Sequence, residues 1–185
     1  MPQGEVETAA TSEERRAHHA VAMRLVRQFP DAALRTPAET VEDVDDDIRK
    51  LAERMADIME RSHGVGLAAP QMGIMLRVLV YRLSSEDEAR VLVNPELSEL
   101  SDDTDVDTEG CLSLLGGELQ VPVERALKLV LTGLDAQGQP VRVEAEGFEA
   151  RVLQHEVDHL NGVLIIDRAA KEDRRSAMRE LRLRA

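Results

Sequence analysis

The sequence predicts one α+β domain in which antiparallel or mixed β-sheets pack around a central helix, with further helices toward the N- and C-terminal ends. The length of 185 residues suits a single domain with a sizeable core. Apolar residues follow a helical period near both ends of the chain and a strand pattern between them. Neither alternating βαβ units nor internal repeats are visible, so this order of elements favours the α+β class.

The first clear helical pattern starts at Val44. Apolar residues recur there at three- and four-residue steps, namely Ile48, Leu51, Met55, Ile58 and Met59. Three consecutive aspartates, Asp45 to Asp47, favour the N-terminal end through the helix dipole, and Gly64 can end the helix. The preceding residues 1–20 are polar without a clear period, so we expect a mobile N-terminal arm there.

Five strands are predicted in the middle of the chain. They cover residues 77–83, 89–93, 119–123, 126–134 and 140–145, and a turn through residues 135–139 joins the last two. A second helix is predicted over residues 148–161, where Asn161 and Gly162 form a stop signal. Residues 171–184 are a third candidate helix.

The charge of the chain excludes one class of partner. The formal net charge is −13, from 36 acidic and 23 basic residues. Because phosphate contacts need a basic face, we expect no direct DNA binding. The acidic stretches 39–47 and 99–107 are predicted to lie in solvated loops and at a helix N-terminus, since neither has the spacing of a calcium loop.

The cysteine content and the N-terminal residues predict the compartment. Cys111 is the single cysteine, which excludes an intramolecular disulfide and suits a reducing environment. Residues 1–20 contain no apolar run of the kind a signal peptide needs, and their acidic residues argue against an organellar transit peptide. No stretch approaches the roughly 20 apolar residues of a membrane span. We therefore expect a cytoplasmic protein without a membrane partner.

The segment His155-Glu156-Val157-Asp158-His159 carries the strongest functional signal. Two imidazoles at i and i+4 face the same side of a helix and can bind one metal ion, with Glu156 placed to move a proton. This helix is apolar on both sides and therefore buried, so its histidines and glutamate need a partner such as a metal with a bound water. The alternative is that the histidines are surface or hydrogen-bonded core residues and the motif arises by chance.

Two upstream segments supply further candidates. Cys111 can complete a set of three protein ligands, although a lone cysteine is more often a small buried apolar residue. A thiolate with two imidazoles suits zinc, iron(II), cobalt and nickel. The glycines and alanines of residues 64–71 either form a tight turn or bind an extended peptide as an added strand. In the second case Gln71 is a candidate amide donor to a carbonyl oxygen.

Taken together, three segments resemble the motifs of peptide deformylases, metal hydrolases that remove the formyl group from the N-terminal formyl-methionine of new bacterial proteins. The segments are residues 64–71 (GVGLAAPQ), 109–113 (EGCLS) and 154–162 (QHEVDHLNG), in the order of the family. The resemblance runs from about Val26 to Arg168. We therefore expect a catalytic domain over residues 21–170, followed by a basic C-terminal helix over residues 171–185.

The resemblance implies roles for six residues. Cys111, His155 and His159 would bind the metal, commonly iron(II) in the cell, with zinc, nickel or cobalt as substitutes. A bound metal lowers the pKa of water to about 7, and the resulting hydroxide would attack the formyl carbon. Glu156 would act as general base and acid by moving the proton of this water to the departing amine. The side chain of Gln71 and the backbone N–H of Leu112 would stabilise the charge that develops on the formyl oxygen.

The resemblance also implies a pocket for the methionine side chain. Its walls would be Val65, Phe148, Val152 and the ring of His155, with the stem of Arg151 at the margin. The backbone of Gly66 would pair with the peptide. The same residues could instead belong to the core.

The sequence departs from the family after Ser113. Many members carry a Pro-Gly or an arginine-bearing loop there, whereas this chain has residues 114–118 (LLGGE), and Val123 stands where an arginine often follows the Val-Pro pair. An acid in place of a cation is expected to affect peptide affinity and sequence preference, with partial compensation by Arg125. The metal ligands are unaffected.

Two other classes of function share some of these residues. A metallopeptidase with the same two-histidine helix would cleave internal peptide bonds, but Cys111 as third ligand and the QHEVDHL context disfavour it. A purely structural metal site would need four protein ligands, and no suitable fourth is apparent.

The C-terminal segment is a basic region on an acidic protein. Its basic residues are Lys171, Arg174, Arg175, Arg179, Arg182 and Arg184. One interpretation is contact with the ribosome, where a formylated nascent peptide emerges. The other is an ordinary solvated charged helix.

Overall fold

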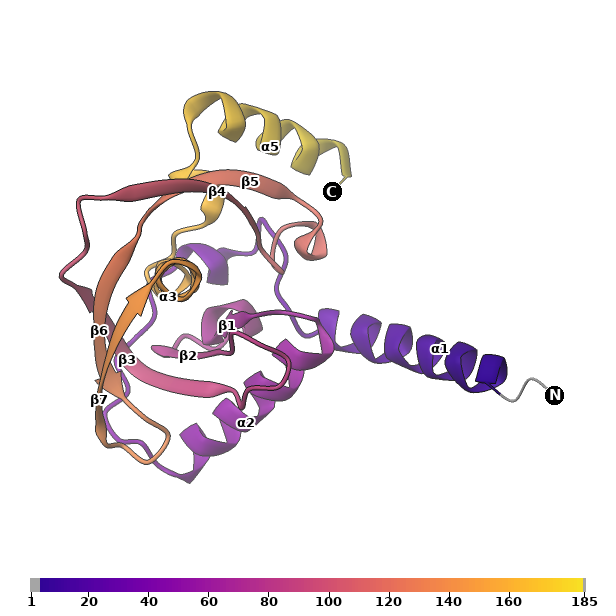
Figure 1. The fold of residues 1–185 in the computed structure, drawn as a ribbon, viewed down its shortest axis with the longest axis horizontal. Helices are drawn as coiled ribbons and strands as arrows, with labels where there is room; N and C mark the ends of the chain where they lie inside the picture. The colour runs from indigo at the N-terminus through magenta and orange to yellow at the C-terminus, as the bar shows by residue number, and fades with distance from the viewer. Residues whose placement is uncertain (1–3, 185) are drawn as a thin grey trace.

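The computed structural model describes residues 4–184, whose strands form two antiparallel sheets (Figure 1). The larger sheet has the strand order β1-β2-β3-β6-β7, and the smaller one pairs β4 with β5. The strands are β1 (Gly66–Ala68), β2 (Val78–Tyr81), β3 (Arg90–Ser98), β4 (Thr104–Gly110), β5 (Gln120–Ala126), β6 (Lys128–Leu134) and β7 (Pro140–Glu146). The helices are α1 (Gly4–Met23), α2 (Asp46–Arg61), α3 (Phe148–Leu160), α4 (Ile165–Arg168) and α5 (Lys171–Arg184). Short 3₁₀ turns cover Ala32–Arg35, Ala69–Met72 and Leu115–Gly117. The predicted α+β class is confirmed.

Helix α3 lies at the centre of the molecule. Figure 1 shows it end-on, with β4 and β5 on one side and β1 and β2 on the other. Most of its residues are buried, including Leu153 and Leu160. The helix ends at Leu160, where Asn161 caps it and Gly162 adopts a positive φ of 71°. A side chain at Gly162 would lie 2.7 Å from the Arg35 backbone, so only glycine fits this close approach. The predicted stop signal is confirmed.

The five-stranded sheet lies between α2 and α3, as the side chains of β2 show. Successive residues of a strand point to opposite faces. Val78 and Val80 belong to the buried cluster that includes Met55 of α2. Leu79 and Tyr81 belong to the cluster that includes Leu153 of α3. A strand buried on both faces reads as a continuous apolar run, which explains why β2 was predictable.

A third buried cluster joins β5 to the C-terminal helix. Val121 and Val123 of β5 belong to it together with Ala177 and Leu181 of α5. These two residues are the buried positions of α5, and the basic side chains of the helix face outward. Helix α5 therefore covers the outer side of the two-stranded sheet (Figure 1).

Three segments differ from the prediction. Residues 99–107 were expected in a loop, but Thr104 to Asp107 belong to β4, whose exposed acidic side chains give no apolar alternation. β1 was not predicted as a strand, because three residues, Gly-Leu-Ala, carry no strand signal. Over the predicted N-terminal arm, residues 4–20 belong to α1, and residues 1–3 lie outside the described part. The mobility of this arm stays a prediction.

Helix α2 begins at Asp46, close to its predicted start. The Asp45 side chain accepts hydrogen bonds from the backbone N–H groups of Asp47 and Ile48, both at 3.0 Å. This is N-capping by a preferred residue, which satisfies backbone donors that lack a partner inside the helix. Of the described helices, none is both long and apolar enough to cross a membrane.

Replacing Asp45 by alanine should lower the free energy of unfolding by about 1 kcal/mol, because two N–H groups lose their acceptor. Urea unfolding followed by circular dichroism measures this. Asp43→Ala is the matched control, since Asp43 is exposed and precedes the cap. Equal stability of the two variants would show that the cap contributes nothing.

Candidate metal centre

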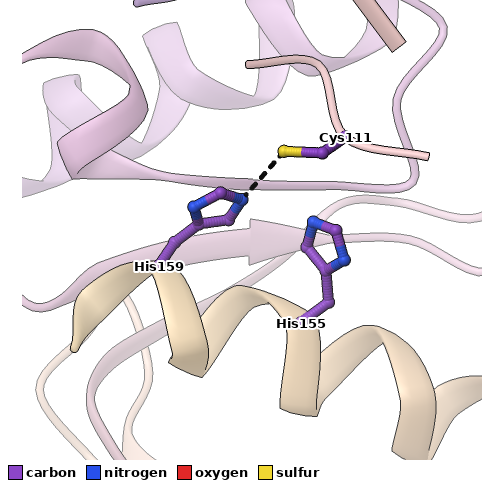
Figure 2. A group of neighbouring side chains, drawn as sticks. All are labelled: Cys111, His155 and His159. Carbon is purple, nitrogen blue, oxygen red and sulfur yellow. Dashed lines mark hydrogen bonds between the residues drawn. The ribbon is translucent and has the colours of Figure 1, made fainter. Parts of the chain in front are cut away.

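Two histidines project from one face of α3 toward the loop that carries Cys111. Figure 2 shows the rings of His155 and His159, one helical turn apart, pointing toward Cys111. His159 is 2% exposed, and the side chain of His155 is 12% exposed. Cys111 follows β4 directly and is 2% exposed. The three candidate ligands that the sequence suggested are therefore neighbours in space.

Their separations suit a single ion. The Sγ atom of Cys111 lies 3.2 Å from Nε2 of His159, and one ligand atom of each of the three residues lies within 4.8 Å of the others. Two tetrahedral ligands with bonds of about 2.3 and 2.0 Å would be roughly 3.5 Å apart. Within residues 4–184, no fourth His, Cys, Asp or Glu joins this group. The arrangement is that of a site with three protein ligands and one open position.

Glu109 orients the first histidine, a role that the sequence did not reveal. Its Oε2 lies 2.9 Å from Nδ1 of His155, which leaves Nε2 of that ring to face Cys111 and His159. Burial opposes ionisation of Glu109, but hydrogen bonds with His155 and Arg125 lower its pKa to about 2. A carboxylate behind a ligand histidine sets the tautomer and raises the basicity of the ring.

Arg125 is the centre of a buried ion-pair network. Its side chain is 5% exposed and donates to both oxygens of Glu109, at 2.9 and 3.0 Å, and to Asp158 at 2.6 Å. Asp158 also accepts from Arg168. The prediction that Arg125 would compensate at the substrate is therefore wrong, because its guanidinium is occupied inside the protein.

The electrostatics of the two histidines fit a bound cation. Burial lowers the pKa of His159 well below its usual value, so the imidazole is neutral and able to bind a metal. Burial also opposes a charge on His155, but hydrogen bonds with Cys111 and Glu109 outweigh this and raise its pKa well above the usual value. The surroundings of His155 thus favour a positive charge, which a divalent metal ion would supply in place of a proton.

Glu156 lies in the space that a glycine leaves. Its side chain is buried, and a Cβ atom at Gly66 would lie 2.3 Å from Glu156 Oε1. Burial raises the pKa of Glu156 to about 7. Its Oε2 atom is buried and has no hydrogen-bond partner in the described part of the chain. Such a carboxylate can accept or donate a proton near neutral pH.

Gln71 directs its amide nitrogen toward Cys111 and Ser113. Its Oε1 accepts from the backbone N–H of Ala68 at 2.9 Å, which sets the orientation of the amide. Nε2 then faces Ser113 Oγ at 3.2 Å and Cys111 Sγ at 3.9 Å. The neighbouring backbone N–H of Leu112 has no hydrogen-bond acceptor within residues 4–184. Both predicted oxyanion donors therefore lie beside Cys111.

These groups open into one cavity of about 280 Å³. The five residues predicted to bind substrate all line it: Val65, Gly66, Phe148, Arg151 and Val152. Gln71, Leu112, Cys111, His155 and Glu156 line it as well, whereas the buried His159 is not among the lining residues. Arg151 is anchored, since its guanidinium donates to Glu109 and to the backbone oxygens of Val123 and Asp105.

The residues that depart from the family lie outside this cavity, apart from Gly117. Glu118 forms an ion pair with Arg184 of α5. Val123 is buried in the cluster below α5. The acid at position 118 therefore has a partner within the chain, and its effect on peptide affinity stays a prediction.

Known proteins resemble this chain over most of its length. The family model described as polypeptide deformylase matches residues 23–175. A peptide deformylase of Dictyoglomus thermophilum is 45% identical over 150 residues, which cover 81% of this chain and 95% of that protein. One of Acidothermus cellulolyticus is 46% identical over 162 residues, with coverages of 88% and 87%. The crystal structure of a peptide deformylase from Synechococcus elongatus covers 84% of both chains, with a TM-score of 0.78 and 36% identity.

Glu109→Gln should weaken metal binding by about 10- to 100-fold, because a neutral amide holds the His155 ring less firmly. Competition between the protein and a chromogenic chelator for Zn²⁺ gives the affinity. Glu124→Gln is the matched control, since Glu124 is exposed on the adjacent strand. Unchanged zinc affinity in Glu109→Gln would remove Glu109 from the metal site.

Proposed function

This chain belongs to the peptide deformylase family, and we propose that it removes the formyl group from formyl-methionine at the N-terminus of newly made proteins in the bacterial cytoplasm. The products are formate and a free amine. One observation supports this proposal most strongly: a group of three candidate metal ligands, a carboxylate with one unpartnered oxygen and two amide donors lie around a single cavity. A metal site with four protein ligands would offer no comparable position for a substrate.

In this proposal, Cys111, His155 and His159 hold one divalent metal ion. The family is metal-dependent, and Fe²⁺ is the ion we propose for the cell, with Zn²⁺, Ni²⁺ or Co²⁺ as substitutes that suit the same ligands. When bound, such an ion lowers the pKa of a bound water from 15.7 to about 7 and so supplies a nucleophile.

Glu156 would act as the general base and then the general acid of this reaction. Its carboxylate takes a proton from the attacking water and later gives it to the nitrogen of the departing amine, as the bond between the formyl carbon and that nitrogen breaks. The pKa of about 7 supports both directions of transfer.

The charge that develops on the formyl oxygen would be stabilised by two donors. They are the Nε2 amide of Gln71, whose orientation Ala68 holds, and the backbone N–H of Leu112. Donors that are fixed before the reaction need no reorganisation, and removing one such donor costs about 100- to 1000-fold in rate.

The peptide would bind along β1. This strand lies at the edge of the five-stranded sheet, and an edge strand keeps backbone groups that pair with no other strand. The backbone of Gly66 is therefore proposed to pair with the peptide as an added strand. The methionine side chain would enter between Val65, Phe148 and Val152, against the ring of His155. The stem of Arg151 would lie at the margin of this pocket.

The function is tested by incubating anaerobically prepared iron protein with a formyl-methionyl peptide and measuring formate. We expect formate and the deformylated peptide with all internal peptide bonds intact. Cleavage of internal bonds without formate would favour a metallopeptidase. No formate above the metal-free control would overturn the proposal.

Three variants should separate the roles of the site residues. Glu156→Ala should keep the metal and lose activity, because no other group there can move the proton. Gln71→Ala should keep the metal and lower turnover by about 100-fold or more. Cys111→Ala should lose the metal. Metal content and formate release are measured on the same samples, and near-normal turnover in either of the first two variants would remove that residue from the mechanism.

The ribosome is the second partner we propose. Its proposed contact is the outward face of α5, which carries five exposed basic side chains. They are Lys171, Arg174, Arg175, Arg179 and Arg182. Ala177 and Leu181 anchor the helix on the opposite side, so this basic face is held outward. Ribosomal RNA at the exit of the nascent chain would attract it.

Replacing Arg175, Arg179 and Arg182 by glutamate should reduce co-sedimentation with ribosomes about tenfold or more and leave formate release unchanged. The control carries the same charge change on α2, at Lys50, Arg54 and Arg61. Co-sedimentation that persists in the α5 variant, or falls equally in the control, would favour the interpretation of α5 as an ordinary solvated helix.

A further inference from the structure

Residues 27–29, which follow α1, contact the two segments that carry the proposed oxyanion donors, Gln71 and Leu112. The backbone N–H of Arg27 donates to the carbonyl oxygen of Gln71 at 2.6 Å. The backbone N–H of Phe29 donates to the carbonyl oxygen of Ser113 at 2.9 Å. Residues 27–29 therefore link the Gln71 turn to the loop that carries Leu112.

Between these two backbone bonds, the side chain of Gln28 uses both ends of its amide. Its Nε2 donates to the carbonyl oxygen of Leu112 at 2.8 Å. Its Oε1 accepts from the backbone N–H of Gly116 at 3.2 Å. One side chain thus connects two points of the same loop, four residues apart in the chain.

This loop needs such support, because its backbone is unusual. Leu115, Gly116 and Gly117 have positive φ angles of 51°, 66° and 89°. A leucine in this region is uncommon and persists only when the surroundings hold it. Met23 packs near Gly116, within 3.6 Å of where a side chain would begin. The loop conformation is therefore supported from the segment that precedes and includes Gln28.

The bonds around Leu112 fix the direction of its N–H group. The carbonyl before this N–H, that of Cys111, accepts from Leu114 at 2.9 Å. The carbonyl after it, that of Leu112 itself, accepts from Gln28. The N–H belongs to the peptide unit of the Cys111 carbonyl, the next peptide unit is held by Gln28, and Leu112 lines the cavity.

We propose that Gln28 is a positioning residue, which holds the Leu112 N–H in the direction of the formyl oxygen. This inference rests on the proposed function. Gln28 is not among the residues that line the cavity, so in this proposal it acts through the loop that carries Leu112. Misplacement of a donor by a fraction of an ångström lowers the rate less than loss of the donor, which costs about 100- to 1000-fold.

Gln28→Ala and the similarly long Gln28→Met should each lower the kcat of formate release about tenfold, with KM and metal content within about twofold of wild type. A donor that acts mainly in the transition state changes kcat rather than KM. Gln28→Glu keeps the acceptor for Gly116 but loses the donor to Leu112, so its kcat should fall as in the other two variants. Gln137→Ala, at an exposed glutamine in the turn between β6 and β7, is the matched control.

Amide hydrogen exchange supplies a readout independent of activity. Exchange at Gly116 should accelerate in Gln28→Ala and Gln28→Met and stay unchanged in Gln137→Ala, because Gly116 loses its acceptor. Normal kcat in all three Gln28 variants of an active enzyme overturns this inference alone, and so does a rise in KM with kcat unchanged. Absence of formate release from the wild-type protein instead overturns the proposed function, and with it the catalytic role of Gln28.

Discussion

Two imidazoles and a carboxylate buried on one helix form the constraint on which the rest of this structure depends. Polar groups removed from water are costly unless they find partners. His155 has Glu109, and His159 has Cys111. Oε2 of Glu156 and Nδ1 of His159 keep no partner among the described residues, and Glu156 lines a cavity. The sheet side and the Cys111 loop therefore satisfy one nitrogen of each histidine, while Glu156 keeps one oxygen available for chemistry.

The ion-pair network behind the ligands connects distant parts of the chain. Glu109 lies on β4, Arg125 on β5, Asp158 on α3 and Arg168 on α4. Buried ion pairs contribute little net stability, because desolvation offsets much of the attraction. Their hydrogen bonds do hold groups in one geometry. We therefore interpret this network as a device that fixes the orientation of His155 rather than as a major source of stability.

Local patterns predicted some parts of this molecule and not others. Helices α2 and α3 were predictable because each has periodic apolar residues and its own end signal. The two histidines were found from their spacing, and Cys111 because it completes a set of three ligands. The contribution of Glu109 was not, because a carboxylate 46 positions before His155 becomes its neighbour only when β4 and α3 come together. The same holds for Gln28, which lies 84 positions before Leu112. Arg125 was misjudged because only tertiary contacts show that its charge is occupied.

The central claim is that three protein ligands hold a metal ion with one position open beside Glu156. A crystal structure of the zinc-loaded protein tests it most directly. We predict one ion bonded to Cys111 at about 2.3 Å and to His155 and His159 at about 2.0 to 2.1 Å, with a water in the fourth position within hydrogen-bond reach of Glu156. A fourth protein ligand, or an ion bound without Cys111, would contradict it.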